Sequence, residues 1–199
     1  MTRHERICRP AYTLQWAVDG YSTMLAETDR QIQEACDRNP SICVVPVGAG
    51  SIAQAVVSHY ALKDLDIRNF TVEPEAAPCL MEALRNRKIT PLETGATIMT
   101  GMNSGTVSTI AWPILEANVC AAVAVSDAEC HESVLSLNSH GINAGPCGAA
   151  TLAAARKLTE ATLLALDPDA VLLLFSTEGK REYTSPCASI SVHEGLGRR

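Results

Sequence analysis

The chain has 199 residues, of which 47% are hydrophobic and 4% aromatic, and its formal net charge is -6. This length allows one domain with a substantial core, and the apolar fraction excludes a disordered chain. An acidic balance without a cluster of lysines and arginines argues against a nucleic-acid partner. The longest apolar run, 119–125, is far shorter than the roughly 20 residues that span a membrane. Because the first residues are charged and form no apolar signal segment, we expect a cytoplasmic protein with no membrane partner.

The predicted elements alternate between helices and apolar strands. The first clear pattern is an amphipathic helix over 21–36, whose inward side carries Met24, Leu25, Ile32 and Ala35. Further along, the patterns predict strands over 42–47, 66–73, 120–125 and 170–175, and helices over 52–60, 76–87, 109–118, 126–139 and 143–166. This alternation is typical of an α/β domain with a mostly parallel sheet. No linker or repeat divides the chain, which predicts a single domain over 1–199.

Local signals refine three of these elements. Pro113 either kinks the helix over 109–118 or lies in its first turn. Ser126 and Glu129 have the spacing of a capping box, in which the two residues satisfy each other's backbone donors at a helix start. The run 120–125 is wholly apolar, which predicts a strand buried on both faces.

The segment 41–62 carries the most informative pattern. An apolar run rich in β-branched residues, typical of a buried strand, leads through Gly48-Ala-Gly-Ser51 into an alanine-rich helix. Glycine lets the backbone approach a ligand closely, and the N–H groups at a helix start carry partial positive charge. The turn is therefore suited to holding a phosphate, although many strand-to-helix turns contain two glycines for steric reasons alone.

Other segments also indicate approach to a ligand. Residues 92–108 are rich in Gly, Thr, Ser and Met, and such a long irregular segment is either functional or a flexible surface loop. The last strand ends in Ser176-Thr-Glu-Gly179, which places hydroxyl groups at the carboxyl end of a buried strand. The glycines within 143–151 indicate that the start of the last helix approaches something closely.

The cysteines do not indicate a metal site. The chain has 8 of them, with no C-x-x-C pair and no regular spacing. Several lie in apolar runs, so buried reduced thiols are a better interpretation than a disulfide or metal framework.

Three segments together resemble one enzyme family. They are Val47-Gly-Ala-Gly-Ser-Ile-Ala53, Val72-Glu-Pro-Glu75 and Phe175-Ser-Thr-Glu-Gly179. Their order and approximate spacing resemble the fold type II pyridoxal-phosphate enzymes, the tryptophan synthase β-subunit-like group. Within this group the sequence is similar to the diaminopropionate ammonia-lyases, on the further stretches 16–25, 97–102 and 112–115. The resemblance runs over 16–179 and implies a three-layer α/β fold, with 180–199 as a surface tail.

The resemblance implies pyridoxal 5′-phosphate as the cofactor. Its phosphate would be held by backbone N–H groups of consecutive residues at the turn and helix start: Gly48, Ala49, Gly50, Ser51 and Ile52. Ser176 or Thr177 would place a hydroxyl at the pyridine nitrogen, a neutral partner that suits elimination chemistry. The reaction that the resemblance implies is α,β-elimination from 2,3-diaminopropionate, which gives pyruvate and ammonia. Residues 97–104 would lie near the mouth of the active site.

The sequence departs from the family in the residues that carry the chemistry. Members of the family attach the cofactor to a lysine that precedes the matched region, so we expect a carboxyl-terminal part lacking the amino-terminal portion of the fold. The chain's own lysines are at 63, 88, 157 and 180, in polar helix ends or loops typical of solvated side chains. Pro146 also stands where relatives can carry glutamate. We therefore expect no catalytic residue here and no turnover by the chain alone.

Three hypotheses remain open at this stage. The chain is a truncated ammonia-lyase, a non-catalytic binder of pyridoxal phosphate or another phosphorylated molecule, or an ordinary nucleotide-binding domain. In the nucleotide-binding hypothesis Glu73 would hold a ribose, but the turn at 48–51 lacks the third glycine of the nucleotide-binding fingerprint. If the chain is a partial domain, exposed apolar surface favours self-association into a homo-oligomer. Its substrate would be a small amino acid once an amino-terminal domain completed the site.

Overall fold

The computed structural model describes residues 16, 18–63, 65–161 and 169–186. Within these ranges a parallel sheet has the order β3-β2-β1-β4. Its strands are β1 (Ile42–Pro46), β2 (Arg68–Pro74), β3 (Val119–Val125) and β4 (Leu172–Leu174). The helices are α2 (Ser22–Cys36), α3 (Ser51–Ala61), α4 (Cys79–Asn86), α5 (Trp112–Asn118), α6 (Asp127–Ser139) and α7 (Pro146–Glu160), with the 3-10 helix η1 (Thr100–Met102). The expected α/β class with a parallel sheet is confirmed.

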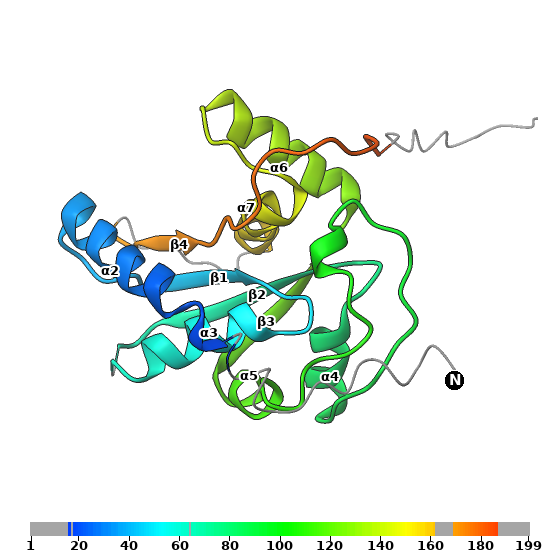
Figure 1. Ribbon diagram of the computed structural model, residues 1–199, viewed down its shortest axis with the longest axis horizontal. Helices are drawn as coiled ribbons and strands as arrows, with labels where there is room; N and C mark the ends of the chain where they lie inside the picture. The colour runs from blue at the N-terminus through cyan, green and yellow to red at the C-terminus, as the bar shows by residue number, and fades with distance from the viewer. Residues whose placement is uncertain (1–15, 17, 64, 162–168, 187–199) are drawn as a thin grey trace, which may run out of the picture.

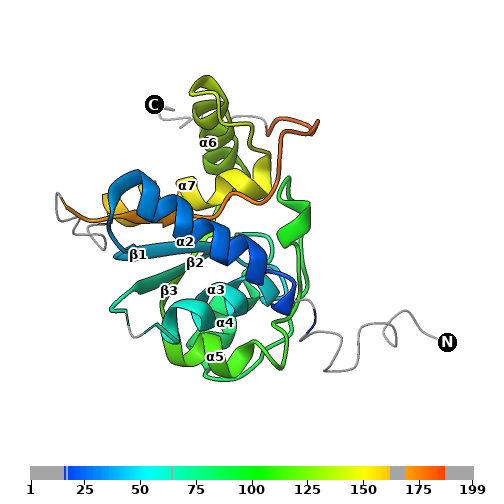
Figure 2. The same ribbon diagram turned by 60° about the vertical axis from the view of Figure 1, so that its left-hand side comes forward.

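Helices cover both faces of the sheet, which makes three layers (Figure 1). Side chains alternate between the two faces along a strand, so neighbouring residues of β1 enter different cores. Ile42 and Val44 pack with α7, whose outer side is covered by α6. Cys43 and Val45 pack on the opposite side with α3 and α4. Figure 2 shows α2 beside the sheet, where it lines a groove with β4.

Strand β1 is the centre of the structure, and its position explains its sequence. Its neighbours are β2 and β4, with Val44 in register with Phe70 on one side and Leu174 on the other. Each of its residues is buried, because it has a strand on either side and a helical layer on either face. This strand therefore holds the turn that follows it, at 48–50, in a fixed place at the carboxyl edge of the sheet.

The outer strands are less buried than their sequences predicted. The run 120–125 was expected to be buried on both faces, but β3 is mostly half-buried and Cys120 is exposed. Strand β4 is half-buried throughout. Both are edge strands of the described sheet, and strand order is a tertiary property that an apolar run does not encode.

Several helix boundaries differ from the predicted ones. The helix expected over 76–87 begins only at Cys79, and the one expected over 109–118 begins at Trp112 with Pro113 in its first turn. The helix expected over 143–166 begins at Pro146, and its predicted end lies outside the described residues. On α2 Leu25 is buried as predicted, whereas Ala35 is exposed.

The cysteines divide into buried and exposed thiols. Buried, unpaired thiols are found at 43, 79, 130 and 147, as predicted for several of the cysteines, whereas those at 36 and 120 are exposed. The remaining two, at 8 and 187, lie outside the described residues.

Among the residues described, no helix is both long and apolar enough to cross a membrane.

Candidate functional site

The turn after β1 requires glycine at two positions. Gly50 is the N-cap of α3 and has φ +100°, in the left-handed region where a side chain is strained. A Cβ atom on Gly48 would lie 3.1 Å from the carbonyl oxygen of Gly101 and 3.2 Å from the Cα of Met102. The sequence therefore lets a second segment of backbone come close to the turn, and both segments border the same space.

That space is a cavity of about 330 Å³ at the carboxyl end of β1. The turn and the start of α3 form one side of it. The opposite sides come from η1, from the first turn of α7 and from the segment after β4: its lining residues include Gly101, Met102, Cys147, Thr177 and Glu178. All five predicted phosphate-binding positions, 48–52, line this cavity, and so does Thr177.

The two hydroxyl residues after β4 lie in different surroundings. Thr177 lines the cavity with the glycine turn. Ser176 packs against α7, because a Cβ atom on Gly148 would lie 2.6 Å from the Ser176 Oγ. Together with Thr177 it lines the neighbouring groove of about 400 Å³ between α2 and β4. The structure thus brings Thr177, rather than Ser176, to the same cavity as the turn.

The helices that follow β2 and β3 have N-termini capped by carboxylates. The Glu73 carboxylate accepts hydrogen bonds from the N–H groups of Leu80 (2.7 Å) and Met81 (2.8 Å), near the start of α4. At the start of α6, Ser126 and Glu129 form the predicted capping box. Charged and polar caps of this kind satisfy the N–H groups that a helix leaves unpaired.

The remaining helix that follows a strand directly is α3, and its N-terminus differs. Its N-cap is Gly50, and within the described part of the chain no side chain caps it. Its first residues, Ser51 and Ile52, line the cavity. The amides at a helix start point outward along the axis and attract anions. The start of α3 therefore has the features that favour an anion, and it opens onto a cavity.

Glu73 does not contribute to the cavity. Its side chain has 0% exposure, and burial raises its pKa to about 7, although the two α4 amides favour the ionised form. It is not available to a ribose, so the structure removes the residue on which the nucleotide-binding hypothesis depended.

Cys79, the first residue of α4, donates from its Sγ to the carbonyl oxygen of Gly48 at 3.4 Å and so ties this helix to the turn.

Sequence reasoning assigned no role to several residues of the cavity wall, among them Glu178 and Cys147. The Glu178 carboxylate accepts a hydrogen bond from the Cys147 N–H at 2.7 Å, so it caps α7 across 31 positions of sequence. The glycines before this helix gave a partial signal, because a Cβ atom on Gly145 would lie 2.4 Å from the Gly179 carbonyl oxygen. For the segment 92–108, which was either functional or a surface loop, the structure places Gly101 and Met102 in the cavity wall.

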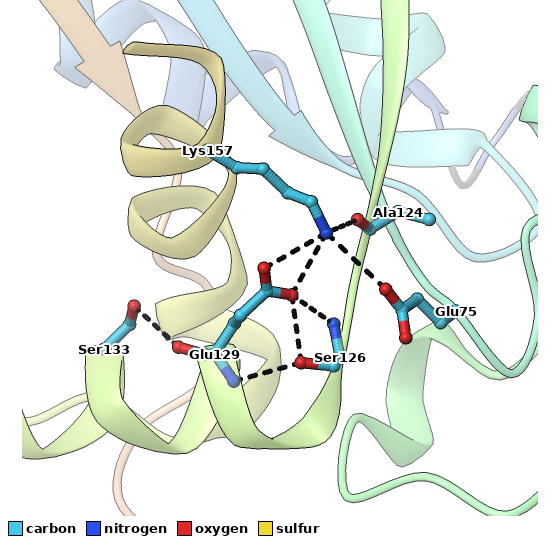
Figure 3. A network of polar contacts seen from close by, with 6 residues as sticks. All are labelled: Glu75, Ala124, Ser126, Glu129, Ser133 and Lys157. Atoms are coloured by element: carbon cyan, nitrogen blue, oxygen red, sulfur yellow. Dashed lines mark hydrogen bonds and ion pairs between the residues drawn. The ribbon is translucent and has the colours of Figure 1, made fainter. Parts of the chain in front are cut away.

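Within the described residues, no lysine lines the cavity. Lys157 instead donates to the Ala124 carbonyl oxygen (3.0 Å) and pairs with Glu129 (3.1 Å) and with Glu75 (3.5 Å), as Figure 3 shows. Partial burial alone would raise the pKa of Glu129, but the Ser126 N–H and the lysine outweigh it and hold the pKa below its ordinary value. Lys63 pairs with Asp29 at the far end of α3.

Comparison with known proteins shows the family. Residues 2–177 match the family described as pyridoxal-phosphate dependent enzyme. The diaminopropionate ammonia-lyase of Salmonella typhimurium is 32% identical over 117 residues, 56% of this chain and 29% of that enzyme. The Escherichia coli K12 enzyme of the same name is 28% identical over 184 residues, 82% of this chain and 45% of that enzyme. The chain thus spans less than half the length of these relatives.

Solved structures agree with this likeness. The crystal structure of the Escherichia coli diaminopropionate ammonia-lyase in complex with an aminoacrylate-PLP azomethine reaction intermediate matches with a TM-score of 0.68 at 27% identity. The match covers 82% of this chain and 45% of that one. Threonine deaminase isoform 2 from Solanum lycopersicum has a TM-score of 0.72 at 17% identity, over 83% of this chain and 46% of that one, and shows the fold alone.

The chain therefore belongs to the pyridoxal-phosphate-dependent enzyme family and has the fold type II, tryptophan synthase β-like architecture. Within that family, the relatives that it resembles in sequence are diaminopropionate ammonia-lyases. The cofactor of the family is pyridoxal 5′-phosphate. The observed cavity fits this group, because the glycine turn and the start of α3, whose N-cap Gly50 has no side chain, line it on one side, and Thr177 lines it on the other.

Proposed function

We propose that the chain is the cofactor-binding part of a pyridoxal-phosphate-dependent ammonia-lyase. Its reaction would be α,β-elimination from 2,3-diaminopropionate or a related amino acid, which gives pyruvate and ammonia. The relatives' names support the reaction class. The observation that carries the binding role is the uncapped N-terminus of α3 facing a cavity of about 330 Å³. When bound, the cofactor supplies an electron sink for the carbanion that forms on the substrate.

The residues of the turn would bind the phosphate through their backbone. Gly48 allows the close approach of Gly101 and Met102, and Gly50 adopts the left-handed backbone conformation from which α3 starts. The amides from Gly48 to Ile52 would donate to the phosphate oxygens. Thr177 is placed to offer a neutral hydroxyl to the pyridine nitrogen, and Ser176 is the alternative donor. Because a hydroxyl carries no charge, it does not hold a proton on that nitrogen as a carboxylate would.

We further propose that the chain does not turn over substrate by itself. Removal of the proton from the substrate requires a base, which in this family is the lysine that also holds the cofactor. Lys157 is held by Glu129, Glu75 and the Ala124 carbonyl oxygen, and Lys63 is held by Asp29. Neither ammonium group is directed to the cavity by these contacts.

Binding of pyridoxine 5′-phosphate to the purified chain tests the cradle directly. This compound lacks the aldehyde, so it cannot react with surface lysines, and calorimetry reports the noncovalent site alone. We expect saturable binding that inorganic phosphate weakens by competition and that pyridoxine, without the phosphate, does not reproduce. Binding of pyridoxine with equal affinity, or no binding of either compound, would contradict the proposal.

A glycine substitution tests the position of the phosphate. Gly48→Ala puts a methyl group 3.1 Å from the Gly101 carbonyl oxygen, so the turn or the cavity wall at 101–102 must shift. We expect at least a roughly tenfold loss of affinity for pyridoxine 5′-phosphate, which is about 1.4 kcal/mol. Gly95→Ala is the matched control, because its added methyl group makes an ordinary 3.4 Å contact with Ala76 away from the cavity. Equal affinities for the two variants would show that the phosphate binds elsewhere.

The lack of turnover has its own test. After incubation with pyridoxal 5′-phosphate and reduction with borohydride, mass spectrometry shows whether one lysine is labelled stoichiometrically. We expect only substoichiometric labelling spread over exposed lysines, and no pyruvate formed from 2,3-diaminopropionate. Full labelling of a single lysine together with pyruvate production would show that the chain contains its own catalytic base.

A further inference from the structure

Arg181 joins two walls of the cavity, although its residue range was expected to be only a surface tail. Its Nε donates to the Glu178 Oε1 at 2.9 Å. Its Nη2 donates to the carbonyl oxygen of Ile98 and, at 3.3 Å, to the Thr100 Oγ1. One guanidinium group thus contacts both the segment after β4 and the segment that enters η1.

The contacted segment, 98–102, is a wall of the cavity. Its last residues, Gly101 and Met102, line the cavity and pack against Gly48. At its other end the Ile98 N–H donates to the Asp127 carboxylate at 3.0 Å, and Thr97 donates to the same group at 2.6 Å. Between these attachments, the contacts with Arg181 tie 98–102 to the segment that follows β4.

The partner of the guanidinium is itself fixed. Glu178 lines the cavity beside Thr177, and its second oxygen accepts the Cys147 N–H at 2.7 Å. Its backbone carbonyl accepts the Gly145 N–H at 2.9 Å. The side chains of Glu178 and Arg181 are 24% and 31% exposed, so water screens their attraction only in part. The hydrogen bond that Arg181 donates to Glu178 also raises the pKa of Arg181, which keeps the guanidinium group charged.

We propose that Arg181 is a positioning residue for the cofactor cavity, which through Glu178 holds the wall formed by 98–102 against Gly48. This inference depends on the proposed function for the identity of the ligand, but not for the position of the wall. A guanidinium can reach the three acceptors together, because it presents donors on several nitrogens in a fixed plane, whereas a lysine ammonium is a single point.

Hydrogen exchange on the chain without ligand tests the position of the wall. In Arg181→Ala we expect the amides of 98–102 to exchange about tenfold faster than in the wild type. The segment loses its hydrogen bonds with Arg181, so it opens locally more often. Arg181→Lys should be intermediate. Lys180→Ala is the matched control, since it removes the adjacent positive charge and leaves in place the hydrogen bond that the Lys180 backbone N–H donates to Asn143. Wild-type exchange in Arg181→Ala, or equal acceleration in the control, would overturn the proposal.

Ligand binding supplies a second readout. We expect Arg181→Ala to bind pyridoxine 5′-phosphate about tenfold more weakly, with Lys180→Ala unchanged. If the wild type does not bind the ligand, the proposed function fails while the exchange result still decides the role of Arg181. If the wild type binds and Arg181→Ala binds equally well, the positioning role fails alone. Should Arg181→Ala not fold, Glu178→Gln keeps an acceptor for the Cys147 N–H and removes the charge, and it should loosen the same wall.

Discussion

The starts of α3 and α6 occupy equivalent places, each directly after a strand of the same parallel sheet, and they are built in opposite ways. The start of α6 is closed by Ser126 and Glu129, and Lys157 from α7 neutralises the carboxylate (Figure 3). The start of α3 has a glycine cap and opens onto the cavity. A helix start that is satisfied by its own chain contributes to stability. One that is left unsatisfied beside a cavity is available to a ligand.

The other two helix starts at this edge follow the closed pattern. Glu73 caps α4 and Glu178 caps α7, each with a carboxylate from a different element. Among the residues that the structure describes, acidic side chains thus cap the starts of α4, α6 and α7, and none caps the start of α3. This contrast predicts that a negative charge is tolerated at α3 only at the expense of ligand binding, and that changes at the closed starts affect stability instead.

The largest effect is expected from adding a carboxylate at the open start. Ser51→Asp should weaken binding of pyridoxine 5′-phosphate about a hundredfold, since like charges a few ångströms apart repel strongly in a partly enclosed site. The melting temperature should stay the same or rise, because acidic residues favour a helix N-terminus. Ser51→Asn is the neutral control of the same size. Calorimetry that finds equal affinity for the two variants would break the comparison.

The next effect concerns Glu73 and pH. Its pKa of about 7 in the folded protein lies above the ordinary value of 4.5 for a glutamate, so folding favours the protonated form. Its contribution to stability is thus full below about pH 4.5 and is lost as pH rises through 7. In the wild type, ionisation of Glu73 should lower the free energy of unfolding by on the order of 2 kcal/mol between about pH 5 and 8. We expect Glu73→Gln, which cannot ionise at this position, not to show this decrease.

Urea denaturation at several pH values measures this difference between wild type and variant. Glu93→Gln, which removes an exposed carboxyl group, is the control and should keep the wild-type pH dependence. A Glu73→Gln profile parallel to that of the wild type would show that the buried carboxyl group does not titrate in this range.

The smallest effect is expected at the closed start of α6. Lys157→Met removes the ammonium group shared by Glu129, Glu75 and the Ala124 carbonyl oxygen, and because these groups are partly exposed the cost should be about 1 kcal/mol. Affinity for pyridoxine 5′-phosphate should not change. Lys88→Met, at an exposed lysine, is the control for urea denaturation. A loss of ligand affinity in Lys157→Met alone would mean that the two helix starts are not independent.

The features that could be predicted from the sequence are local ones. The strand, turn and helix at 42–61 and the capping box of Ser126 and Glu129 are written in consecutive residues, and the structure confirms them. The similarity to the family rests on such segments too. Positions in the sheet were not predictable in this way, since the run 120–125 has the composition of a buried strand but lies at an edge of the described sheet.

The carboxylate caps show a second limit. Glu178 and Cys147 are 31 positions apart, and Glu73 reaches Leu80 across a segment with two prolines, part of which the sequence had assigned to the helix itself. The contact of Arg181 with Ile98 spans 83 positions. Such contacts depend on how the strands are ordered. The sequence therefore showed the glycine turn at α3 and the Glu129 cap of α6, while the caps formed by Glu73 and Glu178 appeared only in the structure.

Amide chemical shifts of the full chain, recorded while pyridoxine 5′-phosphate is added, test the central claim most directly. The account predicts the largest changes at the amides of Gly48 to Ile52, with a smaller change at Thr177 and little change at the capped starts of α4 and α6. Saturable binding that leaves the amides of 48–52 unmoved and shifts another part of the chain would contradict it.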